Sequence, residues 1–175
     1  MRAATSVAIE ISAGRRRRGL VGLAAGLTGV CLAVRVIADQ TLGAHPVDLG
    51  PMDLRLAFNP GVAFSFGDRL PSTVIVALTG SITLGVLVFA WRNARTLTSV
   101  SVVGFAAVLA GALSNLLDRA PDGVVTDYFH TGWYPTFNLP DVLITIGAGL
   151  ILLSTLRHTS DDNDQTADAG QSSTC

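Results

Sequence analysis

Four long apolar stretches dominate the pattern of hydrophobic and polar positions along the chain. They cover about 19–38, 72–91, 97–117 and 139–156. A helix rises about 1.5 Å per residue, so roughly 20 apolar residues are enough to cross about 30 Å of hydrocarbon. The second and third stretches contain no charged residue. The pattern predicts an all-α membrane protein with four transmembrane helices.

The segments between and beyond these stretches differ in character. Residues 47–58 alternate imperfectly between apolar and polar positions, which predicts a small extended or β segment in the outer-face loop between the first two helices. Residues 1–18 are expected to form a basic cytoplasmic segment. Residues 158–175 are polar and acidic, which is typical of a disordered tail. We therefore expect one membrane domain over 19–157.

Arginine side chains predict the orientation of the helices, because cytoplasmic loops of membrane proteins carry an excess of basic residues. Basic residues lie before the first stretch, between the second and third, and after the fourth: Arg15 to Arg18, Arg92, Arg95 and Arg157. Both termini are therefore expected on the cytoplasmic side, with the longer loops 39–71 and 118–138 on the outer face. Arg35 lies near the outer end of the first stretch, where its long side chain can extend to the interface.

The arginine run also permits another interpretation. It could be the basic part of a cleaved signal peptide, including a twin-arginine type, with 20–34 as the apolar part. Three further apolar stretches favour a retained membrane anchor instead. A lipoprotein signal ending at Cys31 fits poorly, because Val30 stands where a small residue should precede the cysteine.

The composition agrees with a membrane protein and narrows the function. The chain is 49% hydrophobic and 14% charged, which is too apolar for an ordinary soluble domain. A formal net charge of −1 offers no basic field for nucleic acid. The two cysteines, Cys31 and Cys175, have no metal-ligand spacing. We expect neither nucleic-acid binding nor a metal or other cofactor.

One face of the third stretch carries polar residues. Gly111, Asn115 and Asp118 recur at helical spacing, and Arg119 follows them. They can belong to a seam of small residues that begins at Gly104, with Asn115 bonding across helices and Asp118 pairing with Arg119 or another charge. They can also line a functional site, since a polar stripe in a membrane must face protein or water.

Two aspartates lie near the outer ends of the helices. Asp127 follows an apolar segment that could return it to the membrane surface, although it could also be a solvated loop residue. Asp141 is explained as part of a helix start, with Asn138 as N-cap and Pro140 in the first turn. The chain order still lets the two carboxylates meet, because one ends the loop that feeds the helix carrying the other. Close carboxylates share a proton, and such a pair can activate a water while it protonates a leaving amine.

Three blocks of sequence resemble the lipoprotein signal peptidases, the signal peptidase II family. They are FNPGVAFSFG from Phe58, GALSNLLDRAPDGVVTDYFH from Gly111 and FNLPDVLITIG from Phe137. The resemblance covers most of the chain from Gly19 to Leu156. It implies a four-helix aspartic endopeptidase of the bacterial cytoplasmic membrane, which cuts lipid-modified preproteins just before a cysteine carrying a diacylglyceryl group. It also implies contact with membrane lipid, no metal, and inhibition by globomycin.

The resemblance assigns roles to particular residues. It implies that Asp127 and Asp141 form the catalytic pair. The residues that would shape the site or hold substrate backbone are Asn59, Gly111, Asn115, Asp118, Arg119 and Asn138. Asn59 precedes Pro60 and Gly61, whose ordinary explanation is a turn between extended residues. Nothing in the sequence suggests a partner subunit, so we expect a monomer.

Three positions depart from the family pattern. The lysine that usually closes the first helix is missing after Thr41, and Ser114 replaces a common glycine before Asn115. Pro140 replaces the alanine usual before the second catalytic aspartate. Because proline suits an early helical position, we expect a shifted site rather than an inactive one.

Two other functions remain open at this point. The chain could be a small transporter or channel subunit in which Asn115, Asp118, Asp127 and Asp141 relay ions or protons. It could also be a non-catalytic lipid-binding scaffold. The polar residues gather at one surface, and the inner halves of the last three stretches carry almost no charge. This distribution favours the enzyme over the transporter.

Overall fold

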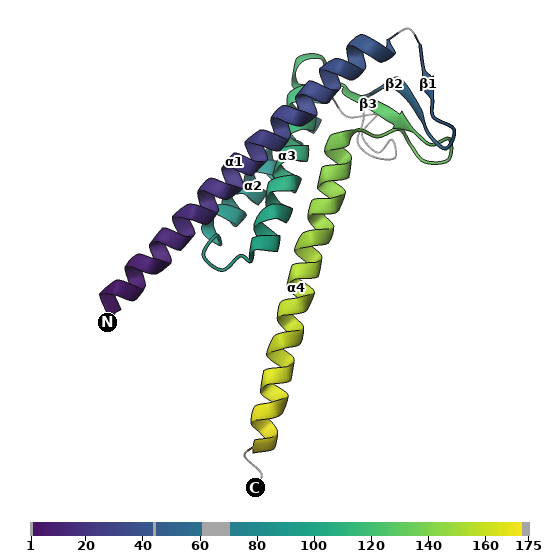
Figure 1. Ribbon diagram of the computed structural model, residues 1–175. Helices are drawn as coiled ribbons and strands as arrows, with labels where there is room; N and C mark the ends of the chain where they lie inside the picture. The colour runs from purple at the N-terminus through teal and green to yellow at the C-terminus, as the bar shows by residue number, and fades with distance from the viewer. Residues whose placement is uncertain (1, 44, 61–70, 173–175) are drawn as a thin grey trace.

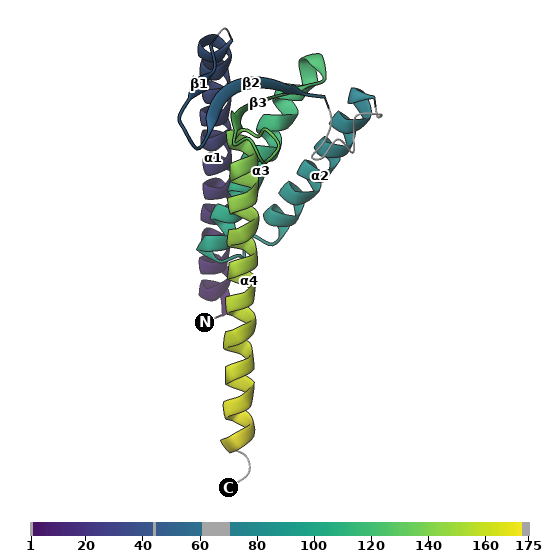
Figure 2. The same ribbon diagram turned by 90° about the vertical axis from the view of Figure 1, so that its right-hand side faces the viewer.

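The computed structural model describes residues 2–43, 45–60 and 71–172, with side chains described between residues 14 and 157 of these ranges. Within them, four helices and three strands follow one another (Figure 1). They are α1 (Arg2–Leu42), β1 (Val47–Asp48), β2 (Asp53–Asn59), α2 (Ser72–Arg92), α3 (Ser99–Asp122), β3 (Val125–His130) and α4 (Leu139–Ser172). The small sheet lies at the end of the helical bundle opposite the two chain termini (Figures 1 and 2).

Each helix contains a segment that is long and apolar enough to cross a membrane. The segments are Gly14–Leu42, Ser72–Arg92, Ser99–Asp122 and Leu139–Arg157. Large apolar side chains on their outward faces are exposed, as expected for surfaces that contact lipid; examples are Ile37, Leu78, Ile82, Ile146 and Leu152. The predicted four-helix membrane fold is confirmed, and the chain is a multi-pass membrane protein.

The first and last helices extend beyond the apolar stretches. α1 already begins at Arg2, and α4 continues to Ser172, so the backbone is helical where a disordered tail is expected from residue 158. Starting a helix is the costly step, whereas extending an existing one adds a hydrogen bond for each residue fixed. A membrane helix can therefore continue into polar sequence that would not form a helix alone. The boundaries proposed at 18/19 and 157/158 stay predictions.

α3 is the central helix, and glycines let it approach α4 closely. A Cβ on Gly104 would lie 2.8 Å from the Gly147 carbonyl oxygen, and one on Gly147 would lie 2.6 Å from that of Gly104. At the ends of the two helices that lie farther from the sheet, the Ser101 hydroxyl donates to Ser154 Oγ at 2.8 Å. The predicted packing seam of small residues is thus present. It brings the backbones of α3 and α4 together along most of their shared length.

The end of α3 directs the chain straight into β3. Gly123 adopts φ 87°, a left-handed conformation that glycine adopts without a steric cost. Its N–H donates to the Arg119 carbonyl oxygen at 2.8 Å, which closes the last turn of the helix. Only two residues separate Asp122, the last of the helix, from Val125, the first of the strand. The polar end of α3 and the start of β3 therefore stay close together.

The sheet is antiparallel, with strand order β1-β2-β3. β1 and β2 confirm the extended segment predicted in the first outer loop. β3 comes from the loop between α3 and α4, and its pairing with β2 was not predicted. In this register Ala57 lies opposite Asp127, after a bulge between Leu54 and Ala57. The part of the FNPGVAFSFG block from residue 61 onward lies outside the described residues.

Candidate active site

The start of α4 is built around Asn138. Its side-chain Oδ1 accepts the Asp141 N–H at 3.0 Å, while its own N–H donates to Asp141 Oδ2 at 3.2 Å. This reciprocal arrangement satisfies two backbone donors at the helix end. The predicted N-cap is confirmed, and the same bonds fix the direction of the Asp141 carboxylate. The structural explanation of this segment and the functional one therefore describe a single arrangement.

Asn138 also holds the second carboxylate. The chain before it runs beside β3, because the N–H of Phe137 donates to the Phe129 carbonyl at 3.1 Å. From there the Asn138 Nδ2 donates to Asp127 Oδ1 at 3.0 Å. The side chains of Asp127 and Asn138 are almost fully buried, at 2% and 1% exposure. One buried amide residue thus contacts both aspartates of the predicted pair.

Asn59 reaches Asp127 from the neighbouring strand. Asp127 lies opposite Ala57, and residues two apart on a strand share a face, so Asn59 is the diagonal neighbour of Asp127. Its Nδ2 lies 3.4 Å from Asp127 Oδ2, a long hydrogen bond. β2 therefore contributes to the site through the register of the sheet.

Asn115 on α3 connects the cluster to the membrane bundle. Its Nδ2 donates to Asp141 Oδ1 at 2.9 Å, and its Oδ1 accepts from Asn138 Nδ2 at 3.1 Å. Asn115 therefore bonds across helices, as one sequence interpretation proposed, and at the same time contacts the predicted site. The two interpretations of the polar face of α3 are compatible.

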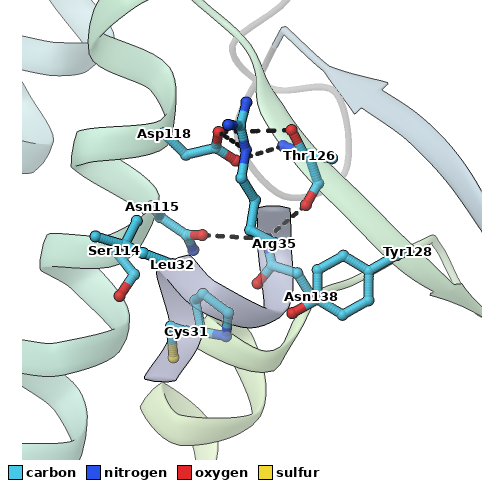
Figure 3. A pocket seen from close by; sticks show the side chains of 10 residues that line it. Cys31, Leu32, Arg35, Ser114, Asn115, Asp118, Thr126, Tyr128 and Asn138 are labelled. Carbon is cyan, nitrogen blue, oxygen red and sulfur yellow. Dashed lines mark hydrogen bonds and ion pairs between the residues drawn. The ribbon is translucent and has the colours of Figure 1, made fainter. Parts of the chain in front are cut away.

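Asp118 and Arg119 lie at the same end of α3 but have different partners. The Arg119 guanidinium donates to the Asn59 carbonyl oxygen at 3.1 Å. The Asp118 carboxylate accepts the Thr126 N–H at 2.7 Å and forms an ion pair with Arg35, whose Nε lies 2.8 Å from Asp118 Oδ1 (Figure 3). Asp118 thus pairs with another charge rather than with Arg119.

Arg35 was missed as a site residue, because we expected its side chain to extend to the interface. The signal was present in the sequence: a charged residue within an apolar helix needs a partner. Tyr128 was missed as well. It is 3% exposed, and its hydroxyl accepts the Leu139 N–H at 3.0 Å, which satisfies another backbone donor at the start of α4. Burial raises the pKa of Tyr128 to about 12, so the hydroxyl stays neutral at physiological pH.

Gly111 allows α3 to lie directly against the start of α4. A Cβ at this position would lie 2.3 Å from the Pro140 carbonyl oxygen and 2.7 Å from Ile144 Cγ1. Both distances are too short for a real contact, so any side chain here would displace the backbone beside Asp141. The structure therefore brings together all eight residues singled out in the sequence. Their roles stay predictions.

A small pocket lies beside this cluster, between α1, α3, β3 and the start of α4 (Figure 3). Its cavity volume of about 10 Å³ is enough for roughly one water molecule. It is lined by Cys31, Leu32, Arg35, Ser114, Asn115, Asp118, Thr126, Tyr128, Asn138 and Pro140. Within the described ranges, no group of three or more His, Cys, Asp or Glu side chains is arranged to hold a metal ion.

Burial raises the pKa of Asp127 to about 7, and the nearby Asp141 carboxylate adds to this effect. The hydrogen bond from Asn59 and the positive charge of Arg119 act in the opposite direction but do not cancel it. A carboxyl group with this pKa is protonated in a large fraction of molecules at neutral pH. Asp127 can therefore carry the proton that two adjacent carboxylates are expected to share.

The raised pKa predicts that stability falls as the pH rises from about 4 to about 7. In this window the folded protein keeps a proton on Asp127 that the unfolded chain has released, so higher pH favours unfolding. Asp127→Asn removes the loss because an amide does not ionise. We expect both proteins to unfold at similar temperatures near pH 4, and the variant to unfold several degrees higher near pH 8. Thermal melts in detergent test this, and an equal difference at both pH values would contradict it.

Comparison with known proteins shows which sequences and folds this chain is similar to. The family model described as Signal peptidase (SPase) II matches residues 24–157. Proteins of Brucella ovis and Brucella melitensis named lipoprotein signal peptidase are each 42% identical over 123 residues, which cover 67% of this chain and 76% of theirs.

Two solved structures of bacterial membrane enzymes, determined by the in meso method, have TM-scores of 0.70 and 0.67 to this chain at 24% identity. They cover 81% and 78% of this chain, and 90% and 92% of their own chains. At this level of identity the likeness concerns the fold.

Proposed function

The chain belongs to the signal peptidase II family, and from this membership we propose that it removes signal peptides from prolipoproteins by cutting just before a cysteine that carries a diacylglyceryl group. The observation that carries the proposal is the arrangement of Asp127 and Asp141 around Asn138. Two carboxylates, one on a strand and one at a helix start, lie within hydrogen-bonding distance of a single buried residue. Such a pair is suited to amide hydrolysis by an activated water.

In the proposed mechanism the pair carries one proton. Asp141 is the better site for the negative charge, since it lies in the first turn of α4 and accepts hydrogen bonds from Asn138 and Asn115. It takes a proton from the attacking water, which adds to the scissile carbonyl carbon. Asp127 gives its proton to the cysteine nitrogen as the peptide bond breaks. The products are a free carboxyl group and a free amine, and the pair again holds one proton.

The surrounding residues would hold the peptide next to this pair. Asn59 and Arg119 are the candidates for contacts with substrate backbone, because β2 and the end of α3 meet beside Asp127. Asn115 and Asn138 orient the carboxylates, and Gly111 keeps α4 close to α3. Asp118 supports the start of β3 through Thr126.

We place both termini on the cytoplasmic side of the bacterial inner membrane and the site at its outer face. The arginines near the N-terminus support this orientation, because they contact the last turn of α2 and the connection between α2 and α3. The Arg17 guanidinium donates to the Trp91 carbonyl oxygen at 3.1 Å and lies 5.1 Å from the centre of the Trp91 ring. Arg16 donates to the Leu97 carbonyl oxygen. Arg16 and Arg17 therefore lie beside the segment that carries Arg92 and Arg95. These basic residues gather at the end of the bundle opposite the site, as cytoplasmic basic residues do.

The proposed partners follow from this placement. The substrates are lipid-modified preproteins, whose acyl chains stay in the bilayer beside the helices while the scissile bond reaches the pair. We propose that the enzyme acts as a monomer, needs no cofactor, and is inhibited by globomycin.

The proposal predicts that cleavage depends on the lipid. Purified protein in lipid nanodiscs is given the same preprotein with and without the diacylglyceryl group, and the products are identified by mass spectrometry. We expect a new N-terminal lipidated cysteine from the modified preprotein and a rate lower by roughly a hundredfold or more without the lipid. Equal rates for both forms would contradict the substrate assignment. Binding without cleavage would favour the lipid-binding scaffold.

A further inference from the structure

Arg35 is a charged residue in the part of α1 that is apolar enough to cross a membrane. Its Nε lies 2.8 Å from Asp118 Oδ1, and the exposed fractions of the two side chains are 34% and 6%. A buried carboxylate in this environment requires a compensating charge. Arg35 supplies that charge from a different helix, and so it links α1 to the outer end of α3.

The same carboxylate has a second partner on the side of β3. Asp118 Oδ2 accepts the Thr126 N–H at 2.7 Å, and the Thr126 hydroxyl lies 3.5 Å from Oδ1. Thr126 is 2% exposed, and the residue that follows it is Asp127. A continuous chain of contacts therefore runs from Arg35 through Asp118 to Thr126 (Figure 3), and the peptide bond continues it to the backbone of Asp127.

We propose that Arg35 is a positioning residue for the peptidase reaction, acting through the Asp118 carboxylate to hold the β3 backbone that carries Asp127. The inference rests on the proposed function, because it concerns the same reaction. Within the part of the chain that the structure describes, the ion-pair partner of Arg35 is Asp118 and neither Asp127 nor Asp141. Arg35 therefore acts on the geometry of the pair rather than on the reacting atoms.

The physical reason is the effect of the ion pair on Asp118. With Arg35 in place, the ionised carboxylate is a strong acceptor for the Thr126 N–H, since hydrogen bonds to charged groups are stronger than neutral ones. Without Arg35, the buried carboxylate has lost its ion-pair partner and turns toward water. This movement weakens its hold on Thr126. A displacement of about 1 Å at a reacting group can lower a rate by roughly a hundredfold.

The test compares four variants with wild type in nanodiscs, using the lipid-modified preprotein: Arg35→Met, Arg35→Lys, Asp118→Asn and the double variant Arg35→Met/Asp118→Asn. We expect Arg35→Met to lower kcat by roughly tenfold to a hundredfold while KM stays within about threefold. Lysine should restore most of the rate, because its ammonium lies only one bond beyond the position of the arginine Nε. Arg92→Met is the matched control: it removes an exposed arginine at the inner end of α2 and should keep the wild-type kcat.

The double variant distinguishes an indirect role from direct substrate contact. If Arg35 acts through Asp118, the Arg35→Met/Asp118→Asn protein loses no more than about threefold beyond the slower of the two single variants. Losses that multiply, or a loss confined to KM, would overturn the proposal. So would a kcat for Arg35→Met equal to that of Arg92→Met.

Hydrogen–deuterium exchange gives a reading that does not need activity. The peptide covering Val125–His130 should exchange faster in Arg35→Met than in wild type, and Arg35→Lys should restore its protection. If wild type cleaves no lipid-modified preprotein, the proposed function fails while the exchange data still test the contact chain. If wild type is active but exchange of this peptide is unchanged in Arg35→Met, the positioning role is wrong.

Discussion

Asp127→Asn and Asp141→Asn are each expected to lower the rate of cleavage of a lipid-modified preprotein by roughly a thousandfold. An amide cannot take a proton from water, and it cannot donate one to a leaving amine. Each substitution therefore removes one half of the proposed proton transfer. The two side chains have nearly the same shape as the originals, so the helix cap at Asn138 and the β2–β3 register should survive. Single-turnover cleavage in nanodiscs measures the effect.

Asp122→Asn is the matched control for these two variants. Asp122 is exposed at the end of α3, and its Oδ1 accepts the Val124 N–H at 3.1 Å, a bond that asparagine can keep. We expect wild-type activity from it. The double variant Asp127→Asn/Asp141→Asn should be about as slow as either single one, because the two residues act as a unit. If either single variant keeps more than about a tenth of the wild-type rate, that residue has no essential part in proton transfer.

The helices were predictable from the sequence because their apolar length reports the thickness of the membrane. The second predicted stretch, 72–91, nearly coincides with α2 (Ser72–Arg92). The ends of the other helices were harder to predict. α3 continues through residues 118–122, three of which are charged, beyond the predicted end at residue 117, until Gly123 stops it. Hydropathy marks the part of a helix that crosses the lipid, whereas the capping residues determine where it stops.

The site was predictable to different degrees on its two sides. The start of α4 is a local feature, and the sequence already predicts Asn138 as its N-cap with Asp141 in the first turn. The position of Asp127 depends on the pairing of β3 with β2, and these strands lie far apart in the sequence. Pairing of this kind is fixed by register and by a bulge, neither of which leaves a clear pattern in so short a strand. The ion pair between Arg35 and Asp118 also joins residues far apart in the sequence. The sequence shows that Arg35 needs a partner within the membrane, but it does not show which carboxylate that partner is.

Asn138 also explains why the departure at Pro140 is compatible with a formed site. The cap consists of two hydrogen bonds: the Asp141 N–H donates to the Asn138 side chain, and the Asn138 N–H donates to the Asp141 carboxylate. Neither bond needs an N–H from Pro140. Proline in the first turn of a helix loses no hydrogen bond within it. The carbonyl oxygen of Pro140 is more sensitive, because it faces Gly111 on α3. This contact leads to the second large effect expected of a single substitution.

Gly111→Ala is expected to lower cleavage by roughly a hundredfold although it adds one methyl group. The new Cβ would lie 2.3 Å from the Pro140 carbonyl oxygen. Since that oxygen belongs to backbone, the methyl can fit only if the start of α4 moves away from α3. Asn138 and Asp141 move with it, and the carboxylates lose their common geometry. The measurement is kcat for the same preprotein, together with the unfolding temperature in detergent.

Two further glycines separate displacement of the site from general loss of packing. Gly104→Ala places a Cβ 2.8 Å from the Gly147 carbonyl oxygen in the same helix pair, but seven residues, or about 10 Å, farther along α3. Gly149→Ala meets nothing within 4 Å. We expect Gly104→Ala to lower the unfolding temperature but to keep kcat within about tenfold of wild type, and Gly149→Ala to change neither substantially. If Gly104→Ala and Gly111→Ala lose stability and kcat in the same proportion, tight packing of α3 against α4 supports the fold as a whole. A kcat loss specific to Gly111→Ala would instead mean that this glycine sets the position of Asp141.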